Sequence, residues 1–183
     1  MSAWTDKRSV KDRYDATAAG YDELYAEEQH RKYKRALRNA DAKSKAVLDV
    51  GCGSGLFFSQ VAGQADLVVG VDVSRSLLVK AKEHGRGYGN IYVILADADH
   101  LPLREGFFGA LFAFTVLQNM PSPQETLAEW KRVTGVGGRV VVTGLKKAFA
   151  LDEFMDLLDA SGMRLDEFVD EEEINCYIAA LTA

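Results

Sequence analysis

The sequence predicts a doubly wound α/β fold, a Rossmann-like sheet of about seven strands that is mostly parallel and covered by helices on both faces. Short strands that are apolar nearly throughout alternate with segments of helical spacing between residues 46 and 162. Such strands are typical of a parallel sheet that is buried on both faces. The pattern then changes, because residues 163–170 and 174–181 both alternate, with only three glutamates between them. Strands joined so closely pair antiparallel, so we expect the sheet to end in a C-terminal hairpin.

The other core elements follow one another through short connections. Strands are expected at residues 46–50, 67–71, 91–95, 107–114 and 139–143. Helices are expected at residues 56–64, 74–85, 122–134 and 151–162. Ser74 is a suitable N-cap for the second helix. Ser122, Pro123 and Glu125 form a predicted capping box at the start of the third.

A polar segment of about 45 residues precedes the first strand. Its apolar positions recur at helical spacing, at Tyr33, Ala36, Leu37 and Ala40. This spacing predicts one or two amphipathic helices laid over the main unit. At 183 residues the chain has the usual size of one domain. We therefore expect a single domain over residues 1–183, with a helical cap at 1–45 and a Rossmann-like core at 46–183.

The composition is that of an ordinary globular protein, with 48% hydrophobic and 27% charged residues. The two cysteines, Cys52 and Cys176, provide neither a disulfide framework nor a metal knuckle, so we expect a cytoplasmic protein without a metal site. The longest apolar run, residues 107–117, is too short to span a bilayer, and no secretory leader is recognisable. Neither secretion nor membrane insertion is expected.

Charge is unevenly distributed along the chain. The net charge is −5, and residues 150–183 hold one basic and ten acidic side chains. A positive field for duplex DNA is therefore not expected. The basic run at residues 31–35 is interpreted as a solvated helix face, with steering of an RNA or other anionic acceptor as the alternative. The acidic run at residues 166–173 is interpreted as the solvated rim of the hairpin.

Candidate ligand-binding residues follow the first three strands. Glycines in the turn at residues 51–55 allow positive φ angles and a close approach of the backbone to a ligand. Asp72 ends the second strand and Asp97 follows the third. In doubly wound sheets the ligand lies at the carboxyl ends of the strands, near the point where strand order reverses. A carboxylate there accepts ribose hydroxyls or an adenine amino group.

A dinucleotide site is the first alternative, and the glycine spacing argues against it. The G-x-G-x-x-G fingerprint requires a third glycine, but that position is Leu56 when counted from Gly51 and Phe58 when counted from Gly53. Asp49, just before the turn, would repel a pyrophosphate and attract an ammonium group. A P-loop is excluded, because no Gly-Lys-Ser or Gly-Lys-Thr occurs. An NAD-linked oxidoreductase is therefore disfavoured.

Three segments of the chain, residues 47–55, 70–74 and 97–103, resemble the first three cofactor motifs of class I methyltransferases. They read Val-Leu-Asp-Val-Gly-Cys-Gly-Ser-Gly, Gly-Val-Asp-Val-Ser and Asp-Ala-Asp-His-Leu-Pro-Leu. Within that class the chain resembles the small-molecule type that includes ubiquinone and menaquinone biosynthesis enzymes, over about residues 10–183. The resemblance implies S-adenosyl-L-methionine as cofactor and methyl transfer as the activity.

The resemblance also implies a role for each motif. It places the 51–55 turn beneath the methionine part of the cofactor, Asp72 at the ribose, and Asp97 with Ala98 at the adenine. It places residues 114–116 beside the methyl group, and Tyr14 and Tyr21 among the aromatic residues that close over the cofactor. The expected cofactor-binding residues are Tyr14, Tyr21, Asp49, Gly51, Cys52, Gly53, Gly55, Asp72, Val73, Asp97, Ala98, Thr115 and Val116.

The acceptor side of the site departs from the family pattern. The family often has a histidine after the fourth strand, whereas this chain has Gln118 and Asn119 there. These amides can orient an acceptor by hydrogen bonds, but they cannot take its proton at neutral pH, so no catalytic residue is assigned. His100 is interpreted as part of a structural turn. A small-molecule acceptor is favoured; the alternatives are an RNA or protein methyltransferase that needs a partner subunit, and a non-catalytic subunit with the cofactor fold.

Overall fold

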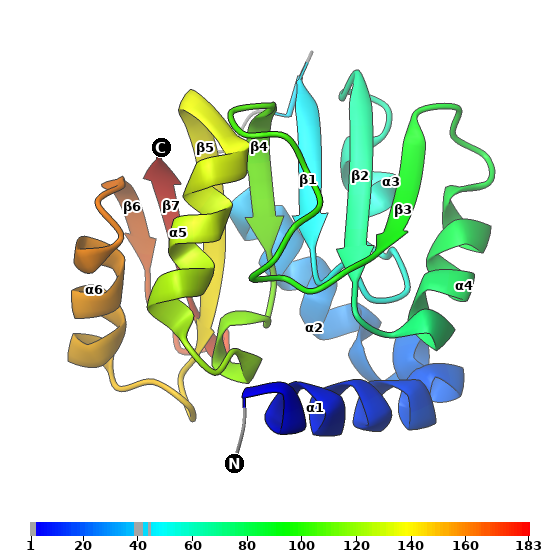
Figure 1. Cartoon of the computed structure of the whole chain (residues 1–183), viewed down its shortest axis with the longest axis horizontal. Helices are drawn as coiled ribbons and strands as arrows, with labels where there is room; N and C mark the ends of the chain where they lie inside the picture. The colour runs from blue at the N-terminus through cyan, green and yellow to red at the C-terminus, as the bar shows by residue number, and fades with distance from the viewer. Residues whose placement is uncertain (1–2, 39–41, 44) are drawn as a thin grey trace.

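The computed structural model describes residues 3–38, 42–43 and 45–183, which form a seven-stranded sheet flanked by helices (Figure 1). The strands lie in the order β3-β2-β1-β4-β5-β7-β6. Their bounds are β1 Ala46–Val50, β2 Leu67–Asp72, β3 Ile91–Leu95, β4 Phe108–Ala113, β5 Thr134–Leu145, β6 Arg164–Val169 and β7 Cys176–Thr182. The helices are α1 Ala3–Thr17, α2 Tyr21–Ala36, α3 Phe58–Val61, α4 Arg75–Gly85, α5 Pro123–Val133 and α6 Leu151–Ala160, with short 3-10 turns at Ala18–Gly20 and Leu117–Asn119.

The sheet has the predicted mixture of parallel and antiparallel strands. β1 pairs in parallel with β2 on one side and with β4 on the other, so the strand order reverses at β1. β7 pairs antiparallel with both β5 and β6, which confirms the antiparallel C-terminal strands and places β7 between the other two. The doubly wound fold predicted from the sequence is therefore confirmed, with a crevice expected at the carboxyl end of β1.

Two buried layers hold the helices to the sheet. Alternate residues of a strand point to opposite faces, and Val47 accordingly packs with residues of α2, α3 and α4, while Leu48 packs with residues of α5 and α6. The segment before residue 45, predicted to form one or two amphipathic helices, forms two, α1 and α2. Figure 1 shows α1 running across the end of the sheet to which the arrowheads of β1 to β4 point. Ala40 lies outside the described residues.

Three local predictions differ from the structure. The helix expected at residues 56–64 is one turn long, because the glycine turn before it and Gly63 after it disfavour helix. β5 begins at Thr134, directly after α5, where a loop was expected, and its glycines lie against the backbone of Gly106 and Phe108. The predicted capping box is wrong, because the Ser122 side chain accepts no hydrogen bond from the helix.

The predicted N-cap of α4 is confirmed. The backbone N–H of Leu77 donates to Ser74 Oγ at 3.2 Å.

No helix in the described part of the chain is both long and apolar enough to cross a membrane.

Candidate active site

A cavity of about 1060 Å³ opens at the carboxyl ends of the parallel strands and is covered by α1 and α2. Its wall comes from α1, α2, the glycine turn, the ends of β2, β3 and β4, and the segments that follow β4 and β5. The lining residues are Lys7, Val10, Arg13, Tyr14, Thr17, Glu28, Gln29, Lys32, Gly51, Gly53, Val71, Asp72, Val73, Leu77, Ala96, Asp97, Ala98, Phe114, Thr115, Val116, Gln118, Asn119, Met120, Leu145, Lys146, Lys147, Ala148 and Asn175. The cavity thus lies where the sequence predicts a ligand site.

The glycine turn forms the floor of this cavity. Gly51, Gly53 and Gly55 have φ angles of 68°, 55° and 83°, in the left-handed region that favours glycine. The backbone N–H of Gly51 donates to the carbonyl of Val71 at 2.7 Å, which ties the turn to the end of β2. A Cβ atom at Gly51 would lie 2.3 Å from Val116 Cγ2. Glycine is therefore required at Gly51 both by backbone conformation and by space.

Asp72 joins the glycine turn to the start of α4. Its Oδ2 accepts the backbone N–H of Gly53 at 2.9 Å, and its Oδ1 accepts that of Ser74 at 2.8 Å. Burial raises the pKa of Asp72, although these two hydrogen bonds oppose the shift. The carboxylate also lines the cavity, so it both organises the wall and faces the space that a ligand would fill.

Three of the expected cofactor-binding residues, Asp49, Cys52 and Gly55, do not line the cavity. Burial, and secondarily the charge of Asp72, raise the pKa of Asp49 well above its usual range. Its Oδ2 is buried and has no hydrogen-bond partner among the described residues. Cys52 is buried and free, and Gly55 packs against Phe58 and α4. These three residues therefore contribute to the local structure around the turn and not to the described cavity surface.

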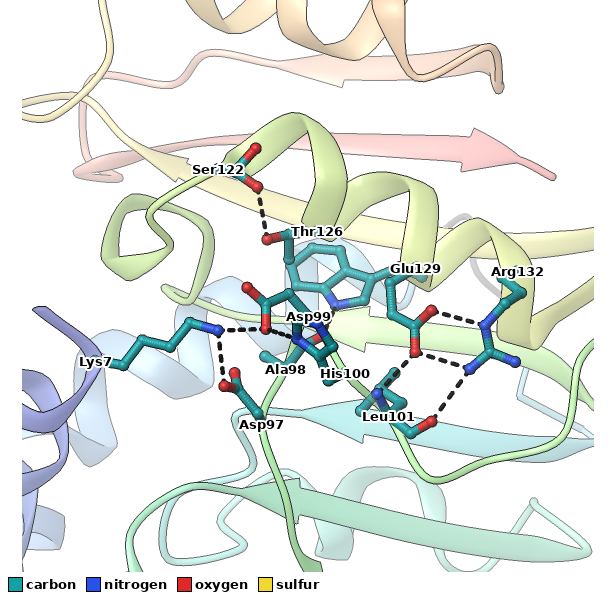
Figure 2. Close-up of polar contacts among 11 residues, drawn as sticks. Lys7, Asp97, Ala98, Asp99, His100, Leu101, Ser122, Thr126, Glu129 and Arg132 are labelled. Carbon is teal, nitrogen blue, oxygen red and sulfur yellow. Dashed lines mark hydrogen bonds and ion pairs between the residues drawn. The ribbon is translucent and has the colours of Figure 1, made fainter. Parts of the chain in front are cut away.

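The segment after β3 is held from both sides, as Figure 2 shows. On one side, Lys7 Nζ of α1 lies 2.7 Å from Asp97 Oδ2 and 2.5 Å from Asp99 Oδ1. Burial alone would lower the pKa of Lys7, but the two carboxylates outweigh it and raise that pKa. On the other side, Trp130 Nε1 of α5 donates to the carbonyl of Ala98 at 2.9 Å. Asp97 therefore lines the cavity while it is ion-paired to α1.

Tyr14 and the segment after β4 both contribute to the cavity wall. Tyr14 lines the cavity, and the side chain of Tyr21 lies outside what the structure describes. Thr115 has a φ angle of 61°, unusual for a β-branched residue. Its carbonyl accepts the amides of Gln118 (2.5 Å) and Asn119 (3.3 Å). Both amide side chains therefore lie in the cavity wall, and their contact with an acceptor stays a prediction.

The part of the cavity wall that α2 contributes was not predicted from the sequence. The interpretation of residues 31–35 as a solvated face is wrong for Lys32, which is buried. Tyr33, predicted on the apolar face of the helix, is buried as expected. Gln29, Lys32, Tyr33 and Ala36 recur at three- and four-residue spacing on one helix face, a signal that could have located them. Other cavity residues that were missed are Lys7, Arg13, Glu28, Lys146, Lys147 and Asn175.

The acidic run of the hairpin, predicted to be a solvated rim, forms ion pairs with other parts of the chain. Arg35 of α2 bonds Glu167 at 3.0 Å and Glu171 at 2.9 Å, and Lys146 bonds Asp170 at 2.6 Å. These ion pairs fasten the covering helix α2, and the segment after β5, to the hairpin.

Histidine contributes nothing to the described cavity wall. His100, the histidine nearest to a motif, has a side chain that is 82% exposed, and its Nδ1 lies 2.7 Å from Asp99 Oδ1. The structural interpretation of His100 agrees with this position. Among the described lining residues, the side chain that most often serves as general base is therefore absent.

Acid is expected to lower the free energy of unfolding by weakening the contact of Asp15 in α1 with Ser74. Hydrogen bonds from Lys11, at 2.7 Å, and from Ser74 hold the pKa of Asp15 well below its usual range. A carboxyl whose pKa is lowered by folding stabilises the protein above its unfolded pKa of about 3.9, and this contribution is lost as the pH falls through the folded pKa. The free energy of unfolding should therefore fall below about pH 5, and less steeply in Asp15→Asn than in the wild type.

Urea titrations between about pH 3 and pH 7 measure this difference. Asp12→Asn is the matched control, because Asp12 is exposed on the same helix, and it should retain the wild-type slope. Coinciding curves for Asp15→Asn and the wild type would show that Asp15 does not anchor α1.

Comparison with known proteins identifies relatives of the chain. Residues 48–142, just over half of the chain, match the family described as methyltransferase domain. The chain is 32% identical to the demethylmenaquinone methyltransferase of Staphylococcus saprophyticus over 143 residues, 74% of this chain and 61% of that protein. It is 26% identical to the malonyl-[acyl-carrier protein] O-methyltransferase of Hamiltonella defensa over 174 residues, 95% of this chain and 63% of that protein. The chain thus spans less than two thirds of either relative.

A solved structure shares the fold. A chain of the Haloferax volcanii complex between the Trm112 methyltransferase activator and a methyltransferase superposes with a TM-score of 0.81 at 16% identity, covering 93% of this chain and 97% of that one. The glycine turn and the acidic strand ends occupy the crevice expected for this fold. On the family match, the chain belongs to the methyltransferase domain family, among the class I S-adenosylmethionine-dependent methyltransferases.

Proposed function

We propose that this chain transfers a methyl group from S-adenosyl-L-methionine to a small-molecule acceptor. The observation that carries the proposal is the position of Asp72 and Asp97, which line one cavity together with Gly51 and Gly53. An adenosyl group offers two ribose hydroxyls and an adenine amino group to such carboxylates. The two curated relatives, both with names that specify small or carrier-bound acceptors, support the acceptor class.

The residues present fit the adenosyl sulfonium. A Cβ at Gly51 would lie 2.3 Å from Val116 Cγ2, so only glycine allows the turn and Val116 to line the cavity together. The buried Oδ2 of Asp49 has no hydrogen-bond partner among the described residues. We infer that Gly51 and Gly53 lie under the methionine part, Asp72 holds the ribose, and Asp97 and Ala98 contact the adenine. Thr115 and Val116 would flank the methyl group, and Tyr14 would cover the cofactor. The cofactor supplies an activated methyl group, and this chain's residues supply attack geometry, which is the main catalytic requirement of an in-line displacement.

The proposal extends to the organisation and location of the chain. We infer that the cap at residues 1–45 and the core at 46–183 act as one domain, since Lys7 and Arg35 tie α1 and α2 to the sheet. We also infer a cytoplasmic location, for which the two free, buried cysteines are suited.

Calorimetry tests the cofactor assignment. S-Adenosylhomocysteine should bind the purified chain, and NAD should produce no heat under the same conditions. Binding of NAD without binding of S-adenosylhomocysteine would overturn the proposal in favour of an oxidoreductase.

Transfer of a labelled methyl group into fractionated cell extract tests the acceptor class. Label is expected in the small-molecule fraction. Label in RNA or protein would replace the small-molecule acceptor by a macromolecular one. Binding of S-adenosylhomocysteine without label in any fraction would favour a non-catalytic subunit or a chain that needs a partner; the Haloferax volcanii structure contains such an activator.

A further inference from the structure

A buried ammonium group lies in the wall of the cavity, on α2. The side chain of Lys32 is 2% exposed, and burying a cation without partners is costly. Its Nζ lies 2.7 Å from Glu28 Oε1 and donates to Thr115 Oγ1 at 3.2 Å. It also lies close enough to Cys176 to lower the pKa of that thiol, against the larger effect of burial. An ammonium has three donors, and a thiol is only a weak acceptor. The N–H of Lys32 that faces Cys176 could therefore donate to a stronger acceptor on a ligand.

Lys32 is joined to the segment that carries the expected acceptor contacts. Thr115, which accepts from Lys32, holds its left-handed conformation through a hydrogen bond from its N–H to Thr143 Oγ1 at 2.7 Å and through the amides of Gln118 and Asn119. Strained backbone of this kind is concentrated at functional sites. The ammonium is thereby fixed beside the residues proposed to flank the methyl group.

Two amide oxygens of the cavity wall lack hydrogen-bond partners among the residues that the structure describes. Gln29 is 6% exposed, and its Oε1 has no hydrogen-bond partner among the described residues; Gln118 Oε1 is also buried and unpartnered there. Both residues line the cavity. Buried polar atoms are nearly always hydrogen-bonded in folded proteins. Their presence in the wall points to a ligand with polar groups of its own.

Cations outnumber carboxylates in the described wall of the cavity. Lys7, Arg13, Lys32, Lys146 and Lys147 line the cavity, against the three carboxylates of Glu28, Asp72 and Asp97. Lys146 is engaged by Asp170 at 2.6 Å, and Lys147 is exposed. A ligand group that enters here meets a positive field and a buried ammonium.

We propose that Lys32 binds the methyl acceptor and that the acceptor presents an anionic oxygen, a carboxylate or an ionised enol or phenol, as the attacking atom. This inference rests on the proposed function. An oxygen lone pair forms the new C–O bond, the S–CH₃ bond breaks, and its electron pair stays on sulfur. No proton has to leave the acceptor, so the step needs no general base, in keeping with the absence of histidine from the described cavity wall.

Three variants test the role of Lys32. Lys32→Gln removes the charge, Lys32→Arg keeps it, and Lys34→Gln removes an exposed charge from the same helix. Lys32→Gln should reduce methyl transfer at low acceptor concentration by about 10- to 100-fold, the effect of losing one hydrogen bond to a charged group. Its affinity for S-adenosylhomocysteine should stay within about threefold of the wild type. Lys34→Gln should match the wild type in both measurements, and Lys32→Arg should recover part of the activity.

A second experiment uses the wild-type chain to test the chemistry of the acceptor. Its result does not depend on whether Lys32→Gln folds. Small molecules from cell extract are separated by anion exchange into acidic and neutral pools, and labelled methyl transfer into each is measured. Label should appear from the acidic pool, as alkali-labile ester or as ether. Label from the neutral pool alone would overturn the inference and leave the proposed function standing.

The amino-acid part of the cofactor is the competing ligand for Lys32, because it also carries a carboxylate. Affinities for S-adenosylhomocysteine and for 5′-methylthioadenosine, which lacks that part, separate the two cases. A tenfold or greater loss for S-adenosylhomocysteine alone in Lys32→Gln would assign Lys32 to the cofactor and overturn the inference. Failure of the wild type to bind S-adenosylhomocysteine would instead refute the proposed function.

Discussion

Replacing Asp72 by alanine is expected to weaken the binding of S-adenosylhomocysteine by about 100-fold or more, the effect of losing two hydrogen bonds to a charged group. The variant removes the carboxylate proposed to hold the ribose. It also leaves the backbone N–H groups of Gly53 and Ser74 without their acceptors. Both effects act in the same direction, because the second loosens the glycine turn and the start of α4.

Asp72→Asn and Asp66→Ala complete this test. The asparagine keeps one acceptor oxygen but turns an NH₂ group toward a backbone donor, so an intermediate loss of about tenfold is expected. Asp66 is exposed beside the opposite end of β2, and its alanine variant should bind normally. Calorimetry measures the affinities, and thermal unfolding separates lost binding from lost folding. An Asp72→Ala affinity within about threefold of the wild type would remove Asp72 from the site.

Replacing Gly51 by alanine is expected to lower the free energy of unfolding by about 3 kcal/mol and to abolish detectable cofactor binding. Two costs add at this position. A residue with a Cβ is strained at a φ of 68°, and that Cβ would lie 2.3 Å from Val116 Cγ2. Relief of the contact requires Val116 to move, and Val116 is part of the cavity wall.

Gly106 offers a control that isolates the first cost. Its φ is 63°, and a Cβ there would meet no atom within 4 Å. Gly106→Ala should therefore cost only the conformational strain, about 1 to 2 kcal/mol. Urea unfolding of both variants gives the difference, which is the contribution of the contact with Val116. Equal losses at the two positions would show that the contact is relieved without cost.

Strand positions could be predicted where the signal was local. β1 and β3 have the predicted bounds, because each is a mostly apolar run between turn residues. Asp72 and Asp97 could be placed at strand ends on the same grounds, and the topology then brings them into one wall. The start of β5 could not be predicted, since Gly135 and Gly138 serve close backbone packing against Gly106 and Phe108 that is invisible in a one-dimensional pattern.

Charged residues on the covering helices could not be assigned from the sequence. Lys7 lies 90 residues from Asp97 along the chain, and no local pattern links the two. Lys32 sits in a run of cations, which normally indicates a solvated face. Its burial depends on how α2 lies across the sheet, a property of the assembled tertiary structure. The same holds for Asp49 and Asp72, which look alike in sequence and differ in which side of the turn they face.

The place of β7 in the sheet sets the order in which translation can complete the fold. β6 leaves the ribosome before β7, yet β7 is its ladder partner and separates it from β5. Until residues 176–182 have emerged, β6 has no neighbour to which its backbone groups can bond. In a nascent chain stalled before Cys176, neither β6 nor β7 can therefore join the sheet. The edge of β5 is then unpaired and can pair with another polypeptide.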